Sequence, residues 1–392
     1  MNIVESTRFY EAWLADQTDL QRKRLGTKHE QMAVGPFPFL CATFYRWIQR
    51  WRKECRQLDQ REEDVLLVVG DLHGENFGTW RDARGRIVWG VVDYDEACQM
   101  PFTMDLVRLA TSIALAVDWV EDDLTLGTIA DCLVAGYQQS LSAGGAPIFL
   151  GEKTWAQLTA WTEAARESPQ DFWTRKLKPE ESPVLKPKQL PRGLEDVFRS
   201  AFARDVKPTY LRQRRPEGLG SLGRRRYIAM VSRDGGQHVA WEARALVPSA
   251  LHWLEMQAAA TSLTATLLQR AVRSPDPSLQ VHDRWLVRQL APDATRLELS
   301  ALRKGSISAL STDLIRAMGF ESANIHLGSR SPRELQTGLS RLDQELGTNW
   351  LRTAAERMVQ VTREDQLAWQ KHWTRHSRSA RHGKSAAGTA SS

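Results

Sequence analysis

The stretch Val68–Phe77, VVGDLHGENF, and the later stretch Val91–Glu96, VVDYDE, decide how this chain folds. Each begins with apolar, β-branched residues and ends in polar ones, which is typical of a buried strand that runs into a loop. Loops at strand ends are frequent positions for binding and catalytic side chains. We therefore expect Asp71, Asn76 and Asp93 to face one site.

The spacing of these residues indicates phosphate chemistry. Asp71 and Asn76 lie five positions apart, so on a tight loop one can act as a base and the other as a metal ligand. The protein-kinase catalytic loop has the same spacing. Asp93 ends a predicted strand, residues 87–92, where a kinase-like site carries its principal Mg²⁺ ligand. Carboxylate and amide oxygens suit Mg²⁺, and Asp95 is either an additional ligand or a supporting group.

Simpler roles remain open for several residues of this region. Aspartate and asparagine also cap turns and helices after strands. His73 is expected to orient the loop by hydrogen bonding, and a role as the base is the alternative. Asp105 begins a predicted helix, residues 104–120, where a carboxylate favours the helix dipole. Arg108, one turn later, either pairs with a carboxylate of the loop or faces solvent.

A glycine-rich segment, Gly218-Leu219-Gly220-Ser221-Leu222-Gly223, precedes a predicted hairpin with strands at 226–231 and 238–243. A dinucleotide-binding fold would place a helix directly after the glycines, so a loop that covers phosphates with its backbone fits this context better. A plain turn is the alternative. Three arginines, residues 224–226, follow the glycines. At most two of them can share one face, because alternate strand residues point to opposite sides.

The composition favours a globular protein. The 392 residues, 42% of them hydrophobic, suffice for two or three domains with ordinary cores. No apolar run reaches the roughly 18 residues of a membrane helix, and the N-terminus carries no export signal, so we expect a cytoplasmic protein without a membrane partner. The four cysteines have no Cys-x-x-Cys spacing and indicate neither zinc nor disulfides. Five of the net +6 charges lie in residues 371–392, a segment without acids, which disfavours nucleic acid as the partner.

The order of predicted elements divides the chain into five segments. Residues 1–167 form a helical lobe with the catalytic and metal-binding loops, and residues 168–216, rich in Pro, Lys and Arg, form a linker or flap. Residues 217–300 form a β-rich nucleotide lobe. Residues 301–372 return as helices to the large lobe, and residues 373–392 are a disordered basic tail.

Together these motifs resemble the bacterial family called domain of unknown function 2252, itself similar to the protein-kinase and aminoglycoside-phosphotransferase superfamily. The similarity extends from about residue 31 to residue 366. Its carriers are GPFPFL at 35–40, GDLHGENFG at 70–78, DYDEA at 93–97, DLVRLATS at 105–112, the glycine-rich segment and VRQL at 287–290. The resemblance implies an α+β, protein-kinase-like two-lobe fold, mostly helical, with a small antiparallel β lobe. Because the glycines follow Asp71 by more than a hundred residues, the lobes would be circularly permuted.

The resemblance also implies roles for individual residues. Asp71 looks like the catalytic base, with His73 beside it, and Asn76, Asp93 and Asp95 look like Mg²⁺ ligands. The residues implied to bind the nucleotide, ATP, are Gly218, Gly220, Ser221, Gly223, Arg244 and Arg288.

The chain departs from the family at the phosphate clamp. Where the family has Lys-Glu-Ala on the strand after the glycine hairpin, this chain has Trp241-Glu242-Ala243. Arg244 would replace the lysine only across a bulge, since residues three positions apart on a strand face opposite sides. A second family lysine is replaced by Ala294, and an Arg-Gly pair by Cys41-Ala42.

Three functions follow, in decreasing order of expectation. The first is an ATP- and Mg²⁺-dependent phosphotransferase that acts on an unknown small molecule or protein. The second is a catalytically weakened nucleotide-binding pseudokinase or regulatory protein, which Trp241 favours. The third is a calcineurin-like metallophosphoesterase, whose first metal motif matches GDLHG at 70–74, although the sequence lacks the Gly-Asp-x-x-Asp-Arg and Gly-Asn-His motifs that would complete the metal set.

Overall fold

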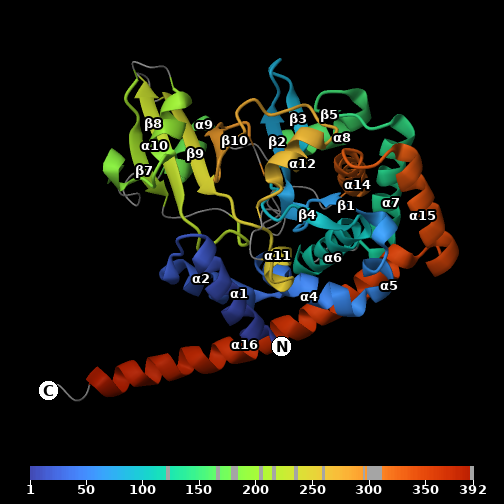
Figure 1. Ribbon diagram of the computed structural model, residues 1–392, viewed down its shortest axis with the longest axis horizontal. Coiled ribbons are helices and arrows are strands. Elements are labelled where there is room, and N and C mark those ends of the chain that lie inside the picture. The colour runs from blue at the N-terminus through green and yellow to red at the C-terminus, as the bar shows by residue number, and fades with distance from the viewer. Residues whose placement is uncertain are drawn as a thin grey trace.

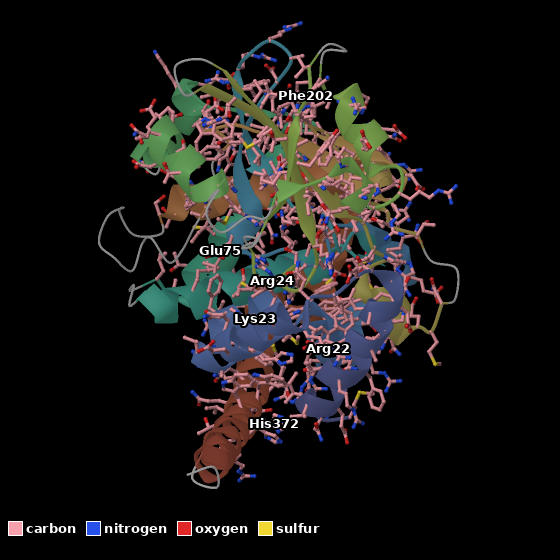
Figure 2. The ribbon with its side chains drawn as sticks, turned by 90° about the vertical axis from the view of Figure 1, so that its left-hand side faces the viewer. Arg22, Lys23, Arg24, Glu75, Phe202 and His372 are labelled. Atoms are coloured by element: carbon pink, nitrogen blue, oxygen red, sulfur yellow. The ribbon has the colours of Figure 1, made fainter. Side chains whose placement is uncertain are left out.

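The structure is a computed structural model. It describes residues 1–120, 124–164, 168–177, 184–202, 206–213, 218–233, 237–257, 261–294, 296–297 and 311–388. The described part is a mixed α+β protein in which a small antiparallel sheet stands beside a larger, mainly helical body (Figure 1). Figure 2 shows α2, marked by Arg22, Lys23 and Arg24, between the small sheet, against which the labelled Phe202 packs, and the long C-terminal helix, marked by His372.

The small sheet contains the glycine-rich segment. Its antiparallel order is β10-β11-β9-β8-β7-β6. The strands are β6 (Val184–Leu185), β7 (Thr209–Gln213), β8 (Arg226–Arg233), β9 (Gln237–Ala245), β10 (Gln280–His282) and β11 (Trp285–Leu290). The glycine-rich segment joins the neighbouring strands β7 and β8. The predicted hairpin and the predicted antiparallel β lobe are therefore both present.

The two sides of β9 have different surroundings, because side chains alternate along a strand. Trp241 and Ala243 belong to a buried cluster with helix α10 (Leu194–Ser200). Glu242 and Arg244 point to the other side, where Glu242 pairs with Arg226 of β8 and Arg244 pairs with Asp93 of the large body. The strand keeps its register with β8 and β11 through this stretch, so no bulge brings Arg244 round to the side of Trp241.

The large body holds two shorter sets of strands. The strand β1 (Val65–Val68) pairs with β4 (Cys98–Pro101), and β3 (Ile87–Val91) lies between β2 (Phe77–Arg81) and β5 (Ile148–Phe149). A tight turn joins β2 to β3, and the Asp82 carboxylate stabilises it by accepting the backbone N–H groups of Arg84 and Arg86 at 2.9 Å each.

Helices build the rest of the large body. At the N-terminal side they are α1 (Ile3–Gln17), α2 (Arg22–Val34), α3 (Pro36–Ala42), α4 (Phe44–Glu54) and α5 (Arg56–Asp59). The central and C-terminal ones are α6 (Thr103–Val120), α7 (Leu126–Ala143), α8 (Ala156–Ala164), α14 (Thr312–His326), α15 (Pro332–Leu346) and α16 (Trp350–Gly388). Helix α9 (Pro169–Leu177) packs on the small sheet, whereas α11 (Ala250–Leu254) and α12 (Thr264–Arg270) pack against the core of the large body. Short 3₁₀ turns lie at Glu62–Asp64, Gly74–Asn76, Lys153–Trp155 and Pro187–Gln189.

Helices α7 and α14 cross at two glycines. A β-carbon at Gly136 would clash with the backbone oxygen of Arg316, and one at Gly319 would clash with that of Leu133. This close approach anchors α14 in the large body, although it follows the small sheet in the sequence.

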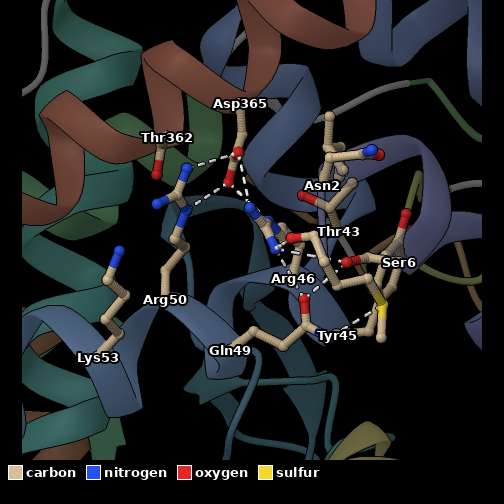
Figure 3. Close-up of polar contacts among 12 residues, drawn as sticks. Asn2, Ser6, Thr43, Tyr45, Arg46, Gln49, Arg50, Lys53, Thr362 and Asp365 are labelled. Carbon is tan, nitrogen blue, oxygen red and sulfur yellow. Dashed lines mark hydrogen bonds and ion pairs between the residues drawn. The ribbon is translucent and has the colours of Figure 1, made fainter.

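The long helix α16 lies along the base of the body and is tied to α4 by a buried charge network (Figure 3). The Asp365 carboxylate accepts hydrogen bonds from Arg46 at 2.7 and 2.9 Å and from Arg50 at 2.8 and 2.7 Å. Burial would raise the pKa of Asp365, but the two guanidinium groups outweigh it and hold that pKa below its usual value. The carboxylate is therefore charged and fixed.

Two of the predicted segments need correction. Within 168–216, predicted as a linker or flap, the described residues form α9, α10, β6 and β7, and the two strands extend the small sheet. Proline and basic residues obscured these short elements. The basic tail, predicted to be disordered from residue 373, continues α16 as far as Gly388, because its alanines and arginines are good helix formers. In the described part of the chain, no helix is long and apolar enough to cross a membrane.

Candidate functional site

One small cavity collects most of the residues singled out in the sequence. The large body contributes Asp71, His73, Asn76, Asp93 and Asp95, and the glycine-rich segment contributes Gly218, Gly220 and Ser221. The cavity has a volume of about 50 Å³, which is room for roughly three to five water molecules. Stretches separated by more than a hundred residues in the sequence thus line one space.

Asp105 fixes the strand end that leads to Asp71. Its buried carboxylate accepts the backbone N–H groups of Val69 at 2.8 Å and Gly70 at 2.9 Å, and it lies 3.2 Å from Nε2 of His326. Gly70 has a φ of +84°, and a β-carbon there would clash with the backbone of Glu96. Asp105 therefore does more than favour the dipole of its own helix. It holds the loop that presents Asp71.

His73 and Asn76 shape the turn that follows. The Asn76 side-chain oxygen accepts the backbone N–H of His73 at 2.6 Å, and Nδ1 of His73 accepts the backbone N–H of Glu75 at 3.2 Å. Burial, together with the nearby charge of Arg108, holds the pKa of His73 well below its usual value. The ring is neutral and orients the loop, with its Nδ1 already engaged.

Asp71 lies between a buried arginine and the glycine-rich segment. Arg108 pairs with Oδ1 of Asp71 and also donates to the backbone oxygen of Leu40 at 3.0 Å. On the other side, a β-carbon on Gly220 would lie 3.3 Å from Oδ2 of Asp71. Burial raises the pKa of Asp71 to about 6, and Arg108 opposes part of that rise. Of the two roles left open for Arg108, pairing with a loop carboxylate is the one observed.

Three further carboxylates are held by arginines from distant segments. Asp93 accepts from Arg244 at 3.1 Å and from Arg296 at 2.8 Å. Arg244 also lies 3.0 Å from Asp95, which Arg224 approaches to 3.4 Å. Burial would raise the pKa of Asp93, but Arg244 and Arg296 outweigh it and hold that pKa far below its usual value.

Glu96 completes this group. It accepts the backbone N–H of Ala250 at 2.7 Å and lies 3.6 Å from Arg224. Burial raises the pKa of Glu96 to about 7, although Arg224 lowers it in part. The cavity therefore combines carboxylates that are firmly ionised with others that can carry a proton near neutral pH.

The glycine-rich segment is docked on α2 as well as on Asp71. The backbone oxygen of Gly223 accepts the N–H of Gln21 at 2.8 Å, and Leu20 forms a β-bridge with Arg224. Gly223 does not line the cavity. Its φ is +110°, and a β-carbon there would lie 2.7 Å from Leu25, so Gly223 is a docking point rather than a cavity wall.

A pair of glycine substitutions tests this docking. Gly223→Ala is expected to lower the free energy of unfolding by about 1–3 kcal/mol, because alanine disfavours a positive φ and its methyl group meets Leu25. Gly26→Ala, on α2 with open space around it, is expected to raise it by about 0.5–1 kcal/mol. Urea denaturation of both variants measures the difference. Equal effects of the two substitutions would contradict the docking.

Arg244 and Arg288, both expected to bind the nucleotide, have different surroundings. Neither is among the residues that line the cavity, but Arg244 pairs with Asp93 and Asp95. The guanidinium of Arg288 lies 3.9 Å from Glu242 and borders a neighbouring pocket of about 270 Å³. Trp241, at the position of the family lysine, packs against α10 on the far side of the sheet.

Lys28 and Arg296 are among the cavity residues that sequence reasoning missed. Lys28 is buried on α2 together with Met32, four positions later. A lysine in line with the apolar residues of a helix was the available signal. Arg296 lies in a short irregular segment, and its pairing with Asp93 depends on contacts far apart in the sequence.

The fold and the site together define a mixed α+β protein with a carboxylate-rich cavity closed by a glycine-rich loop. Residues 20–178 match the model of a family described as an uncharacterized protein conserved in bacteria, DUF2252. The matched range includes the loops that carry Asp71 and Asp93 and supports the resemblance to this family for that part of the chain, whereas the glycine-rich segment and the motif at 287–290 lie outside it. No curated protein and no solved structure matches the chain.

Proposed function

We propose that the protein is an ATP- and Mg²⁺-dependent phosphotransferase with kinase-like lobes in permuted order, acting on a small molecule or a protein. One observation carries the proposal: Gly220 of the glycine-rich loop lies directly over the carboxylate of Asp71. A backbone-lined loop above a buried carboxylate is suited to hold a phosphate chain next to a base.

The order of strands supports a kinase-like small lobe. In protein kinases the glycine-rich loop covers the phosphates and a lysine on the third strand contacts them. Here the loop joins β7 and β8, and β9 is the next strand. The basic residue that β9 directs at the carboxylates is Arg244, which lies on the opposite side of the strand from Trp241, the position of the family lysine.

Asp71 is suited to the role of base. Its pKa of about 6 leaves it mostly ionised at neutral pH while keeping it basic enough to accept a proton from an acceptor hydroxyl. Oδ1 is held by Arg108, so Oδ2, which faces the loop, is the oxygen available for that proton. His73 keeps the loop in shape and takes no proton, because Nδ1 is engaged.

The residues fit Mg²⁺ in kind. Asn76, Asp93 and Asp95 supply oxygen ligands, although among the described residues no three His, Cys, Asp or Glu side chains are arranged to hold a metal by themselves. Mg²⁺ is commonly held by one or two carboxylates together with substrate phosphates, so a site completed by the nucleotide is consistent with this arrangement. When bound, the ion would neutralise phosphate charge. Arg244 and Arg296 keep Asp93 ionised for it.

The non-catalytic alternative has its own supporting observation. The carboxylates are already neutralised by arginines, and Trp241 cannot reach the cavity from the far side of the sheet. A nucleotide-binding pseudokinase or regulatory protein with this site would bind ATP without turning it over. The metallophosphoesterase has less support, because the sequence lacks the Gly-Asp-x-x-Asp-Arg and Gly-Asn-His motifs that would supply its further metal ligands.

Nucleotide binding tests the proposal. Wild-type protein is expected to bind ATP in titration calorimetry only with Mg²⁺, and Asp93→Asn is expected to raise the Kd by about tenfold or more. Asp131→Asn, an exposed acid on α7, is the matched control and should bind as the wild type does. Equal affinity of the Asp93→Asn variant and the wild type would refute the assignment. If the protein binds ATP but does not turn it over, even slowly, the result would favour the pseudokinase.

A further inference from the structure

Lys28 places a buried ammonium group at the wall of the cavity. It lies on α2, only 2% of its surface is exposed, and it borders the same space as Asp71 and the glycine-rich loop. Its nitrogen lies 5.8 Å from the ring centre of Tyr45. A lysine at this depth is unusual, since lysine is almost never fully buried without a partner.

The ammonium group has no ion pair in the described part of the chain. The other two basic residues of the cavity wall are committed: Arg224 pairs with Asp95 at 3.4 Å, and Arg296 pairs with Asp93 at 2.8 Å. For Lys28, the described residues provide the contact with the Tyr45 ring but no hydrogen bond. An anionic ligand can therefore approach Lys28 without breaking an existing ion pair.

We propose that Lys28 binds a phosphate group of the ligand and so supplies, from α2, the phosphate-binding lysine that β9 lacks. The inference rests on the proposed function, because it takes the ligand to be a polyphosphate. Lysine binds phosphate as a point charge and does not need the fork geometry of arginine. The cavity of about 50 Å³ between Lys28 and the loop is small and suits a compact anion.

The electrostatic surroundings of Lys28 predict that ligand binding depends on pH. Burial lowers the pKa of Lys28, although Glu11 opposes the shift. The titratable and charged groups around it are Tyr10 and Glu11 of α1, Tyr45 of α4, Asp71 and Glu96 of the large-body loops, and Arg224 of the glycine-rich segment. A phosphate beside Lys28 favours its charged form, so binding should take up protons, and affinity should fall as the pH rises through the lowered pKa.

The experiment compares Mg²⁺-ATP and tripolyphosphate as probes, in titration calorimetry and in thermal unfolding. Lys28→Met keeps the apolar stem and removes the charge, and its Kd for both probes is expected to rise by about 10- to 100-fold. Its Tm should equal or exceed that of the wild type, since a buried unpaired charge disappears. Lys28→Arg should recover part of the affinity. Lys53→Met, on the exposed side of α4, should leave the Kd within about twofold, the scale of small surface effects.

The outcomes separate this inference from the proposed function. Lys28→Met binding both probes as tightly as the wild type would overturn the role of Lys28 and leave the proposed function standing. If tripolyphosphate binding depends on Lys28 and ATP does not bind at all, the anion site is supported and a nucleotide is excluded as the ligand. No binding of either probe to the wild type would overturn both. If Lys28→Met fails to unfold cooperatively, Lys28→Gln takes its place in the same titrations, and binding of both probes as tight as that of the wild type would overturn the inference.

Discussion

Asp105→Ala is expected to lower the free energy of unfolding by about 3–5 kcal/mol. The substitution leaves the buried N–H groups of Val69 and Gly70 without an acceptor, and each such group costs about 1–3 kcal/mol. It also removes the partner of the buried His326. Because those N–H groups hold the strand end before Asp71, the variant should lose ligand binding even below its melting temperature.

Urea denaturation followed by circular dichroism measures this effect, with Asp131→Ala as the control. Asp131 is an exposed acid on α7, and its replacement should change the free energy of unfolding by less than about 0.5 kcal/mol. Asp105→Asn keeps one acceptor oxygen, so its loss in the free energy of unfolding should lie between those of Asp105→Ala and Asp131→Ala. A loss below about 1 kcal/mol for Asp105→Ala would mean that other groups or water satisfy the two N–H groups.

Asp71→Asn is expected to destabilise the protein by about 3–5 kcal/mol, because it leaves a buried charge without its counterion. Arg108 is fully buried, and without Asp71 it keeps a hydrogen bond to Leu40 and contacts with the rings of Phe44 and Trp47. These contacts do not replace an ion pair. If Asp71 is the base, the same variant should lose about 10²–10⁴-fold in phosphoryl transfer.

A double-mutant cycle separates the two effects of Asp71→Asn. Asp71→Asn/Arg108→Met removes both charges and should recover most of the stability lost by Asp71→Asn, while transfer stays low. The coupling energy comes from denaturation of the two single variants and the double variant. Additive destabilisation would show that Asp71 and Arg108 do not stabilise each other. Recovery of transfer in the double variant would exclude Asp71 as the base.

The sequence was most informative where local patterns decide the structure. The apolar runs before Asp71 and Asp93 do form strands, and the glycine-rich segment does join two strands of a hairpin-rich sheet. The alternation of side chains along a strand also correctly predicts that Trp241 and Arg244 face opposite sides of the sheet. These features depend on neighbours within a few residues, which a single sequence contains.

The charge partners of the site were not predictable in the same way. The sequence does not decide between the two roles of Arg108, it has no local signal for Arg296, and Lys28 lies on an otherwise strongly polar helix. Each reaches its position through packing between segments that are far apart in the chain. Sequence alone also misassigned the basic tail, because its composition fits a solvated helix as well as a disordered segment.

The arginines that neutralise Asp93 and Asp95 have a consequence for how the chain is made. A ribosome completes the loops with these carboxylates long before it reaches Arg224, Arg244 and Arg296, and His326, which contacts Asp105, comes later still. Domains that fold during synthesis do so as units once their parts have emerged. The nascent large body would carry a cluster of like charges with no counterions, so it should wait, incompletely closed, for the end of translation.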